Sequence, residues 1–181
     1  CTTFVETVTA LTRCINKGRT DFNSFVKELE MIRYRNGKCN GYESRLHYFS
    51  EWIYNNQTMG IVEEILPDTL IETEQRSINF MSLNADRYKG ITSDTILSKI
   101  EATEAFLSAQ PFSYIPKHKV ALLTKESVKE GDIIAIVTDI KGLDISHVGF
   151  ATFVDGKIHL LHASSAKKEV ITDPLPLSEY L

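Results

Sequence analysis

The chain has few cysteines, and their spacing is not that of a metal site. Its three cysteines, Cys1, Cys14 and Cys39, are an odd number without a CxxC pair. That spacing excludes a zinc ribbon and argues against a disulfide framework. No HExxH or comparable ligand set is present, so no metal and no other cofactor is expected. At least one thiol should be free.

Long hydrophobic runs and blocks of like charge are also missing. The longest apolar stretches, such as residues 132–137, are strand-sized and far too short to span a membrane. The formal net charge is −4 without a basic cluster, which argues against nucleic acid or an anionic membrane as a partner. We therefore predict no transmembrane segment and no nucleic-acid partner. These features leave the oligomeric state undetermined.

There is no internal repeat, low-complexity tract or Pro/Gly-rich linker. A length of 181 residues suits one core of ordinary size, so we interpret residues 1–181 as a single domain. The chain lacks an initiator Met and opens inside a motif. We therefore expect that a segment upstream of Cys1 has been removed or lies outside the given sequence, and the completeness of the C-terminus stays open.

Helical patterns occupy much of the first 110 residues. Residues 2–17 carry apolar side chains at helical spacing, with Cys14 off the stripe: Phe4, Val8, Leu11 and Ile15. Thr3 and Glu6 stand in the relation of a capping box at its start. Three more helices are expected at residues 22–33, 45–54 and 93–106.

After residue 116 the pattern changes to short β-branched runs separated by Gly and Asp. Strands are expected at residues 120–123, 133–138, 148–154, 157–162 and 169–172. Asp155-Gly156 lies between two alternating runs and is the strongest short-range hairpin signal. Helices followed by an antiparallel meander predict the α+β class and not a doubly wound parallel sheet.

Cys1 stands directly before the first helix. The helix dipole and the free backbone N–H groups there stabilise a thiolate, which needs a general base as partner. Five histidines are candidates: His47, His118, His147, His159 and His162. Cys1 is the candidate nucleophile.

Hairpin geometry predicts which face of the sheet three of these histidines occupy. A two-residue turn pairs Val154 with Lys157, which places His147 opposite Ser164. His162 is then on the same face, diagonal to His147 and within about 7 Å at the Cβ atoms. His159 is an odd number of residues away and points to the other face. A nucleophile and two histidines on one surface are what a Cys-His-His triad needs.

Four segments together resemble the NlpC/P60 cysteine peptidases. Residues 1–5 (CTTFV) are similar to the helix-opening cysteine motif, and residues 128–134 (VKEGDII) to the Gly-Asp strand entry. Residues 146–150 (SHVGF) resemble the catalytic His-Val-Gly strand, and residues 161–164 (LHAS) the segment that supplies the third polar residue. The four occur in the order of the family and span nearly the whole chain.

One departure from that family is a long insert at about residues 18–116, which delays the Gly-Asp strand. The combination is similar to a divergent branch described as N-acetylmuramoyl-L-alanine amidase-like. The resemblance implies a papain-like α+β fold and a Cys1, His147, His162 triad. It also implies a peptidoglycan or muropeptide substrate and a location in the cell envelope, periplasmic or secreted.

Five further residues are candidate substrate contacts: Arg45, His47, Tyr48, Asp144 and Ser164. Arg45 has the charge to bind a stem-peptide carboxylate, and Tyr48 the ring to pack on a sugar or peptide. Each has a structural alternative, since Arg45 and His47 equally suit the edge of a core and Asp144 suits a loop cap. Phe49 and Trp52 are expected in the core.

Other functions stay open on the sequence alone. A catalytically silent wall-binding module would keep the fold and the ligand but not the reactivity of Cys1. An acyl- or peptidyl-transferase acting on a non-wall amide would use the same nucleophile. Glycoside hydrolysis would need two carboxylates flanking a sugar cleft, and no such pair stands out. Cys1 could also be lipidated, autoprocessed or simply buried.

Overall fold

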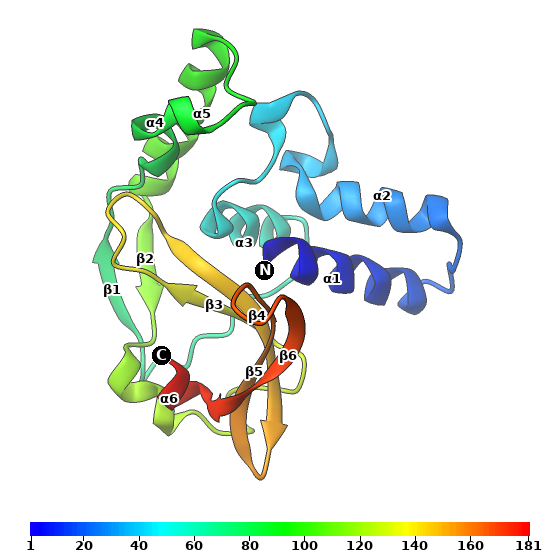
Figure 1. Cartoon of the computed structure of the whole chain (residues 1–181), viewed down its shortest axis with the longest axis vertical. Helices are drawn as coiled ribbons and strands as arrows, with labels where there is room; N and C mark the ends of the chain where they lie inside the picture. Colours follow the sequence, from blue (N-terminus) through cyan, green and yellow to red (C-terminus); the bar gives the residue numbers. More distant parts are fainter.

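The first two helices form a hairpin that projects from the rest of the molecule. The computed structural model describes residues 1–181, and its α1 (Thr2–Asn16) and α2 (Phe22–Arg33) run side by side (Figure 1). Asp21 caps α2 by accepting a hydrogen bond from the Ser24 amide at 3.0 Å. The first two predicted helices are confirmed.

The remaining elements are four helices, four 3-10 turns and two sheets. The helices are α3 (Phe49–Thr58), α4 (Phe80–Leu83), α5 (Asp94–Ser108) and α6 (Leu177–Tyr180), with 3-10 turns η1 (Arg35–Gly37), η2 (Tyr42–Ser44), η3 (Ala85–Arg87) and η4 (Lys117–Leu122). Antiparallel strands β1 (Glu72–Gln75) and β2 (Pro111–Tyr114) form the small sheet. The larger sheet is a meander of β3 (Ile133–Val137), β4 (Ile145–Val154), β5 (Lys157–Ser164) and β6 (Glu169–Pro176) in chain order. This arrangement is of the α+β class, as predicted.

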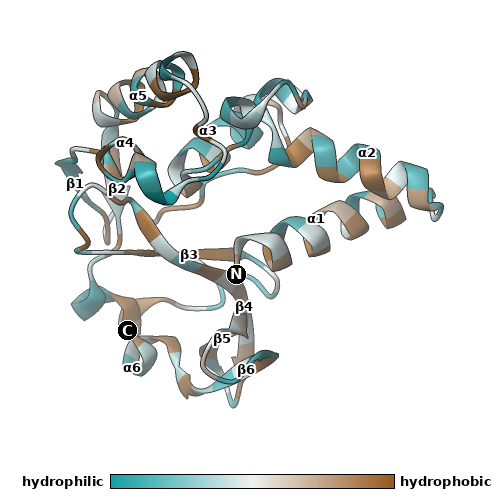
Figure 2. Ribbon diagram, turned by 45° about the horizontal axis from the view of Figure 1, so that its top comes forward, coloured by the Kyte–Doolittle hydropathy of each residue, from teal (hydrophilic) through white to brown (hydrophobic).

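The larger sheet is packed on both faces. Val148 and Phe150 of β4 belong to a cluster formed with α1, α2 and α3, which includes the buried Trp52 and Phe49 as predicted. Ala151 belongs to a second cluster, which includes Leu177 of α6. Alternate residues enter the two clusters because side chains alternate along a strand. Figure 2 shows hydrophobic colouring along β3, at the edge of this sheet.

The predicted apolar stripe of α1 is only half correct: Phe4 and Val8 pack against the first cluster, but the second half of the stripe does not. Leu11 and Ile15 are 46% and 69% exposed, whereas Cys14 is only 3% exposed. The apolar residues of α1 that are fully buried are Val5, Ala10 and Cys14, and Val5 and Ala10 share a cluster with Ile32 of α2 and Val148 of β4.

Three other local predictions are corrected by tertiary contacts. The third helix begins at Phe49 and not at Arg45, since Arg45 bridges Tyr34 in extended backbone. Residues 120–123 are not a strand but lie largely in η4, which buries Val120 against the second cluster. The strand β2 was not predicted; it pairs with β1 from the long insert, and this pairing has no local signal.

Candidate active site

Cys1 is a free, exposed thiol at the start of a 15-residue helix. Its carbonyl accepts the first helical hydrogen bond, from the Val5 amide at 3.2 Å. Its side chain makes no capping hydrogen bond, so the sulfur is not occupied as a cap. The preceding N–H groups of the first turn have no helical partner. A helix start of this kind favours a thiolate over a thiol.

The first turn of α1 is seated on β4. The Phe4 ring packs edge-on against Phe150 with centroids 5.6 Å apart, and Val5 shares a buried cluster with Val148. Both ribbon views place the N-terminus beside β4 (Figures 1 and 2). The chain therefore begins next to the strand that carries His147.

His147 and His162 contact each other directly. His147 Nε2 lies 2.7 Å from His162 Nδ1, and the rings meet edge to face with centroids 4.9 Å apart. The hairpin register is as predicted, since Val154 pairs with Lys157 and the alignment continues to Phe150 and Leu161. His162 is buried and His147 half-buried.

Gly149 explains how two histidines fit on neighbouring strands. A Cβ at this position would lie 2.7 Å from the Leu161 carbonyl oxygen and 3.0 Å from His162 Cβ. These distances are too short for any side chain. The glycine of the His-Val-Gly segment therefore leaves the space that His162 occupies, and sequence reasoning had attached no physical role to it.

The environment of His147 favours its neutral form. Burial lowers the pKa of His147, and the charge of His162 lowers it further. A neutral imidazole can accept a proton, which is what a general base requires.

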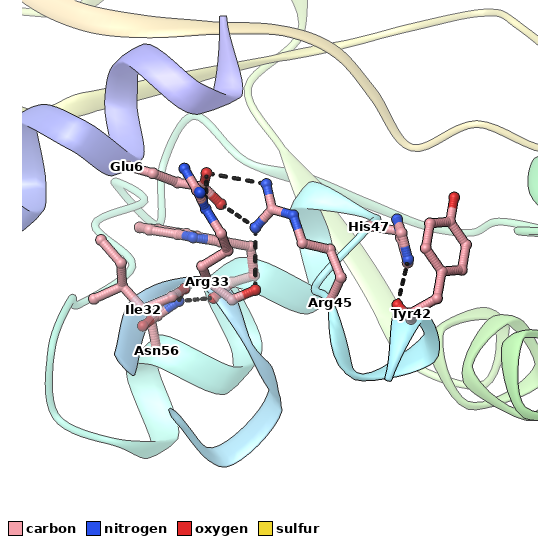
Figure 3. Close-up of polar contacts among 8 residues, drawn as sticks. Glu6, Ile32, Arg33, Tyr42, Arg45, His47 and Asn56 are labelled. Carbon is pink, nitrogen blue, oxygen red and sulfur yellow. Dashed lines mark hydrogen bonds and ion pairs between the residues drawn. The ribbon is translucent and has the colours of Figure 1, made fainter. Parts of the chain in front are cut away.

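Glu6 has a different role from the one predicted. It does not cap α1 but is completely buried, and its carboxylate accepts from Arg45 at 2.6 and 3.0 Å and from Arg33 at 3.0 Å (Figure 3). Both arginines come from the long insert. The ion pairs fix the first turn and a half of the helix that begins at Cys1, a function that spacing along one helix could not indicate.

The three insert residues predicted to bind substrate are engaged within the protein. Arg45 pairs with Glu6, and His47 Nε2 donates to the Tyr42 carbonyl at 2.9 Å (Figure 3). Tyr48 is buried; its hydroxyl donates to Glu104 at 2.6 Å and accepts from the Met81 amide at 2.8 Å. The void that all three border has a volume of ≈ 10 Å³, room for about one water. Their role in substrate binding stays a prediction.

Asp144 and Ser164 lie at the ends of the strands that carry the histidines. Asp144 is buried just before β4, and its Oδ2 accepts from the Ser50 amide at 2.7 Å. It therefore caps the start of α3 from another part of the chain. Ser164 ends β5, and its Oγ accepts from the Lys167 amide at 3.3 Å. It is partly exposed, and its contact with substrate stays a prediction.

A large cavity lies away from this site. Its volume is ≈ 920 Å³, and it runs between α3, β3 and the small sheet. Cys1, His147 and His162 are not among its lining residues. The candidate nucleophile Cys1 and the candidate base His147 therefore lie outside this cavity, which is mainly apolar.

Comparison with known proteins shows the family of the chain. The whole chain, residues 1–181, matches the AmiA-like family, described as N-acetylmuramoyl-L-alanine amidase-like. The chain belongs to the AmiA-like family. This AmiA-like chain is 39% identical to an N-acetylmuramoyl-L-alanine amidase from Bacteroides uniformis ATCC 8492, with a TM-score of 0.90, over 100% of this chain and 76% of that one. No curated protein matches it.

Two further solved structures are similar to the AmiA-like chain. A Bacteroides fragilis protein with a provisional xylanase name is 37% identical, with a TM-score of 0.89, over 100% of this chain and 80% of that one. Protein LPG0564 from Legionella pneumophila str. Philadelphia 1, of the family DUF1460, is 24% identical with a TM-score of 0.67, over 99% and 69% of the two chains. The last likeness shows the fold alone.

Two other structural facts concern metals and membranes. No group of three or more His, Cys, Asp or Glu side chains is arranged to hold a metal ion. None of the helices has the length and apolar character needed to cross a bilayer.

Proposed function

We propose that the chain is a cysteine-dependent amide hydrolase of bacterial peptidoglycan, of the NlpC/P60-like, papain-like kind. The observation that carries the proposal is a free thiol at the start of a helix that packs on β4, the strand that carries His147, whose ring contacts His162 at 2.7 Å. The AmiA-like family description supports an amidase. The proposed residues are Cys1 as nucleophile, His147 as base and His162 as the group that orients the base.

The reaction proceeds through a thioester. His147 takes the proton of Cys1, and the sulfur bonds to the amide carbonyl carbon. The C–N bond then breaks, and His147 returns the proton to the leaving amine. Water attacks the thioester as His147 takes one of its protons, which releases the acid and restores the thiol. The free N–H groups of the first turn of α1 are the candidate donors to the oxyanion.

The proposed substrate is a muropeptide in the cell envelope, periplasmic or secreted. The family description favours the amide between the lactyl group of muramic acid and L-Ala. A bond to a D-amino acid within the stem peptide would use the same chemistry. Both are amides, so the mass of the products identifies the bond.

One specific observation favours a second candidate, because a relative at 37% identity has a provisional xylanase name. Glycoside hydrolysis needs two carboxylates about 5 to 9.5 Å apart across a sugar. Two carboxylates on the histidine-bearing side do not fit this need, because Asp144 caps α3 and Asp173 faces His162. Amide hydrolysis therefore stands first.

The test is mass spectrometry of purified muropeptides incubated with the chain or with its Cys1→Ala variant. We expect new fragments only with the unchanged chain, and rates reduced by about 10⁴-fold or more in Cys1→Ala and His147→Ala. Cys39→Ser is the matched control, since Cys39 is also a free exposed thiol. It should retain full activity.

The outcomes separate the alternatives. Identical digests for the chain and Cys1→Ala, with muropeptide binding kept by both, would favour a silent wall-binding module. Transfer of the acyl group to an added amine in preference to water would identify a transferase. Release of a sugar reducing end, or of sugars from xylan, that survives Cys1→Ala would favour the glycosidase.

A further inference from the structure

Asp173 faces the buried end of the histidine pair. Its Oδ2 lies 3.7 Å from His162 Nε2, the separation of an ion pair and longer than a hydrogen bond. His162 Nε2 is buried and has no hydrogen-bond partner. A buried polar atom without a partner is costly, so a small closure onto the carboxylate is favourable.

The backbone of β6 aims Asp173 at this point. Leu161 pairs with Thr172, but His159 pairs with Pro176, so β6 carries two extra residues at this bulge. The Asp173 carbonyl accepts from His159 Nδ1 at 2.9 Å, and Asp173 Oδ1 accepts from the Leu175 amide at 3.0 Å. With the backbone and one carboxylate oxygen anchored, Oδ2 is left for His162.

We infer that Asp173 is a positioning residue that fixes the proton arrangement of the histidine pair. Its effect on catalysis rests on the proposed function. A proton held on His162 Nε2 by the carboxylate makes His162 Nδ1 an acceptor. His147 Nε2 then donates across the 2.7 Å contact, and His147 Nδ1 keeps the lone pair that removes the Cys1 proton.

The other neighbours of His162 are compatible with this role. The Tyr180 ring of α6 packs edge-on against His162, with centroids 5.5 Å apart. Burial raises the pKa of the Tyr180 phenol, and the charge of Asp173 raises it further. The titratable groups that face His162 are thus His147 from β4, Asp173 from β6 and Tyr180 from α6. Among them Asp173 supplies the negative charge.

The test is Asp173→Asn in the full chain. Asparagine keeps an oxygen for the Leu175 amide but removes the charge beside His162. We expect kcat on muropeptides to fall about 10- to 100-fold with KM little changed, and Asp173→Glu to restore part of it. Asp155→Asn is the matched control, because Asp155 lies in the hairpin turn at positive φ, which asparagine tolerates.

Two readouts do not depend on hydrolysis. The rate of Cys1 alkylation by iodoacetamide between pH 6 and 8 should fall in Asp173→Asn, while that of exposed Cys39 serves as reference within the same chain. Nitrogen NMR of the imidazoles should show His162 protonated at Nε2 in the unchanged chain and a mixture in the variant. Unchanged kcat, alkylation rate and His162 signal would overturn the inference. A chain without Cys1-dependent hydrolysis would overturn the proposed function alone, because alkylation and NMR would still decide the role of Asp173.

Discussion

The two sides of the site are held by different physical means. The nucleophile side depends on buried charge: Glu6 pairs with Arg33 and Arg45, which are 27 and 39 residues away in sequence. The histidine side depends on backbone pairing in one hairpin, and His147 and His162 are only 15 residues apart. The ion pairs of Glu6 require contacts between distant parts of the sequence. The histidine contact follows from one tight turn and from the alternation of side chains along the two strands. Substitutions that affect one side and spare the other can test this contrast.

The largest effect is expected from Glu6→Gln. It leaves two arginines facing a neutral side chain in a buried place, so we expect the free energy of unfolding to fall by about 3 kcal/mol. Urea denaturation measures this. Because the start of α1 loses its anchor, alkylation of Cys1 should slow as well.

Glu28→Gln is a matched control for Glu6→Gln. Glu28 is also nearly buried and pairs with two cations, Arg13 and Lys17, but it ties α2 to the far end of α1. It should reduce stability and leave Cys1 reactivity unchanged. Equal loss of Cys1 reactivity in both variants would mean that α1 responds as a whole, and the local anchoring by Glu6 would be rejected.

The next effect is expected on the histidine side, from Gly149→Ala. The added methyl meets the Leu161 carbonyl and His162 Cβ, so we expect a loss of about 2 kcal/mol from overpacking and a displaced His162. Ala151→Val, on the same strand and also buried, overpacks the second cluster without touching His162. If both variants lowered activity equally at matched stability, the close fit at Gly149 would not matter for function.

The same contrast explains what the sequence could predict. The hairpin register and the proximity of His147 and His162 needed only Asp155-Gly156 and the parity of strand positions. Glu6 was misinterpreted because its partners lie in the insert, and a Thr3–Glu6 spacing is all that the helix itself shows. Asp173 is not predicted, because the sequence pattern ends the last strand at Thr172. Asp173 is two residues from Ile171, the partner of His162, so the two side chains are expected on the same face of the strand.

A smaller effect is expected where the two sides meet. Asp144 precedes β4 and caps α3, so Asp144→Ala should cost about 1 kcal/mol, the usual cost of a lost cap. It should also reduce activity, because it loosens the strand that carries His147. Asp21→Ala removes a similar cap from α2, far from the site, and should match the loss of stability with full activity. A fall in activity with both would show that stability alone is limiting.

The smallest effect is expected from pH. Burial lowers the pKa of His47 below its usual 6.5, with Arg45 and Arg35 adding to the shift against the raising effect of the Tyr42 carbonyl. His147 shifts in the same direction. The unfolded chain therefore binds protons first on acidification, so stability should fall as the pH drops below about 7. His47→Gln keeps a donor for Tyr42 and removes one of the two titrations, so urea midpoints across this range should fall less steeply than in the unchanged chain. An unchanged slope would assign the acid sensitivity to the sheet side, where His147 lies, and not to the insert.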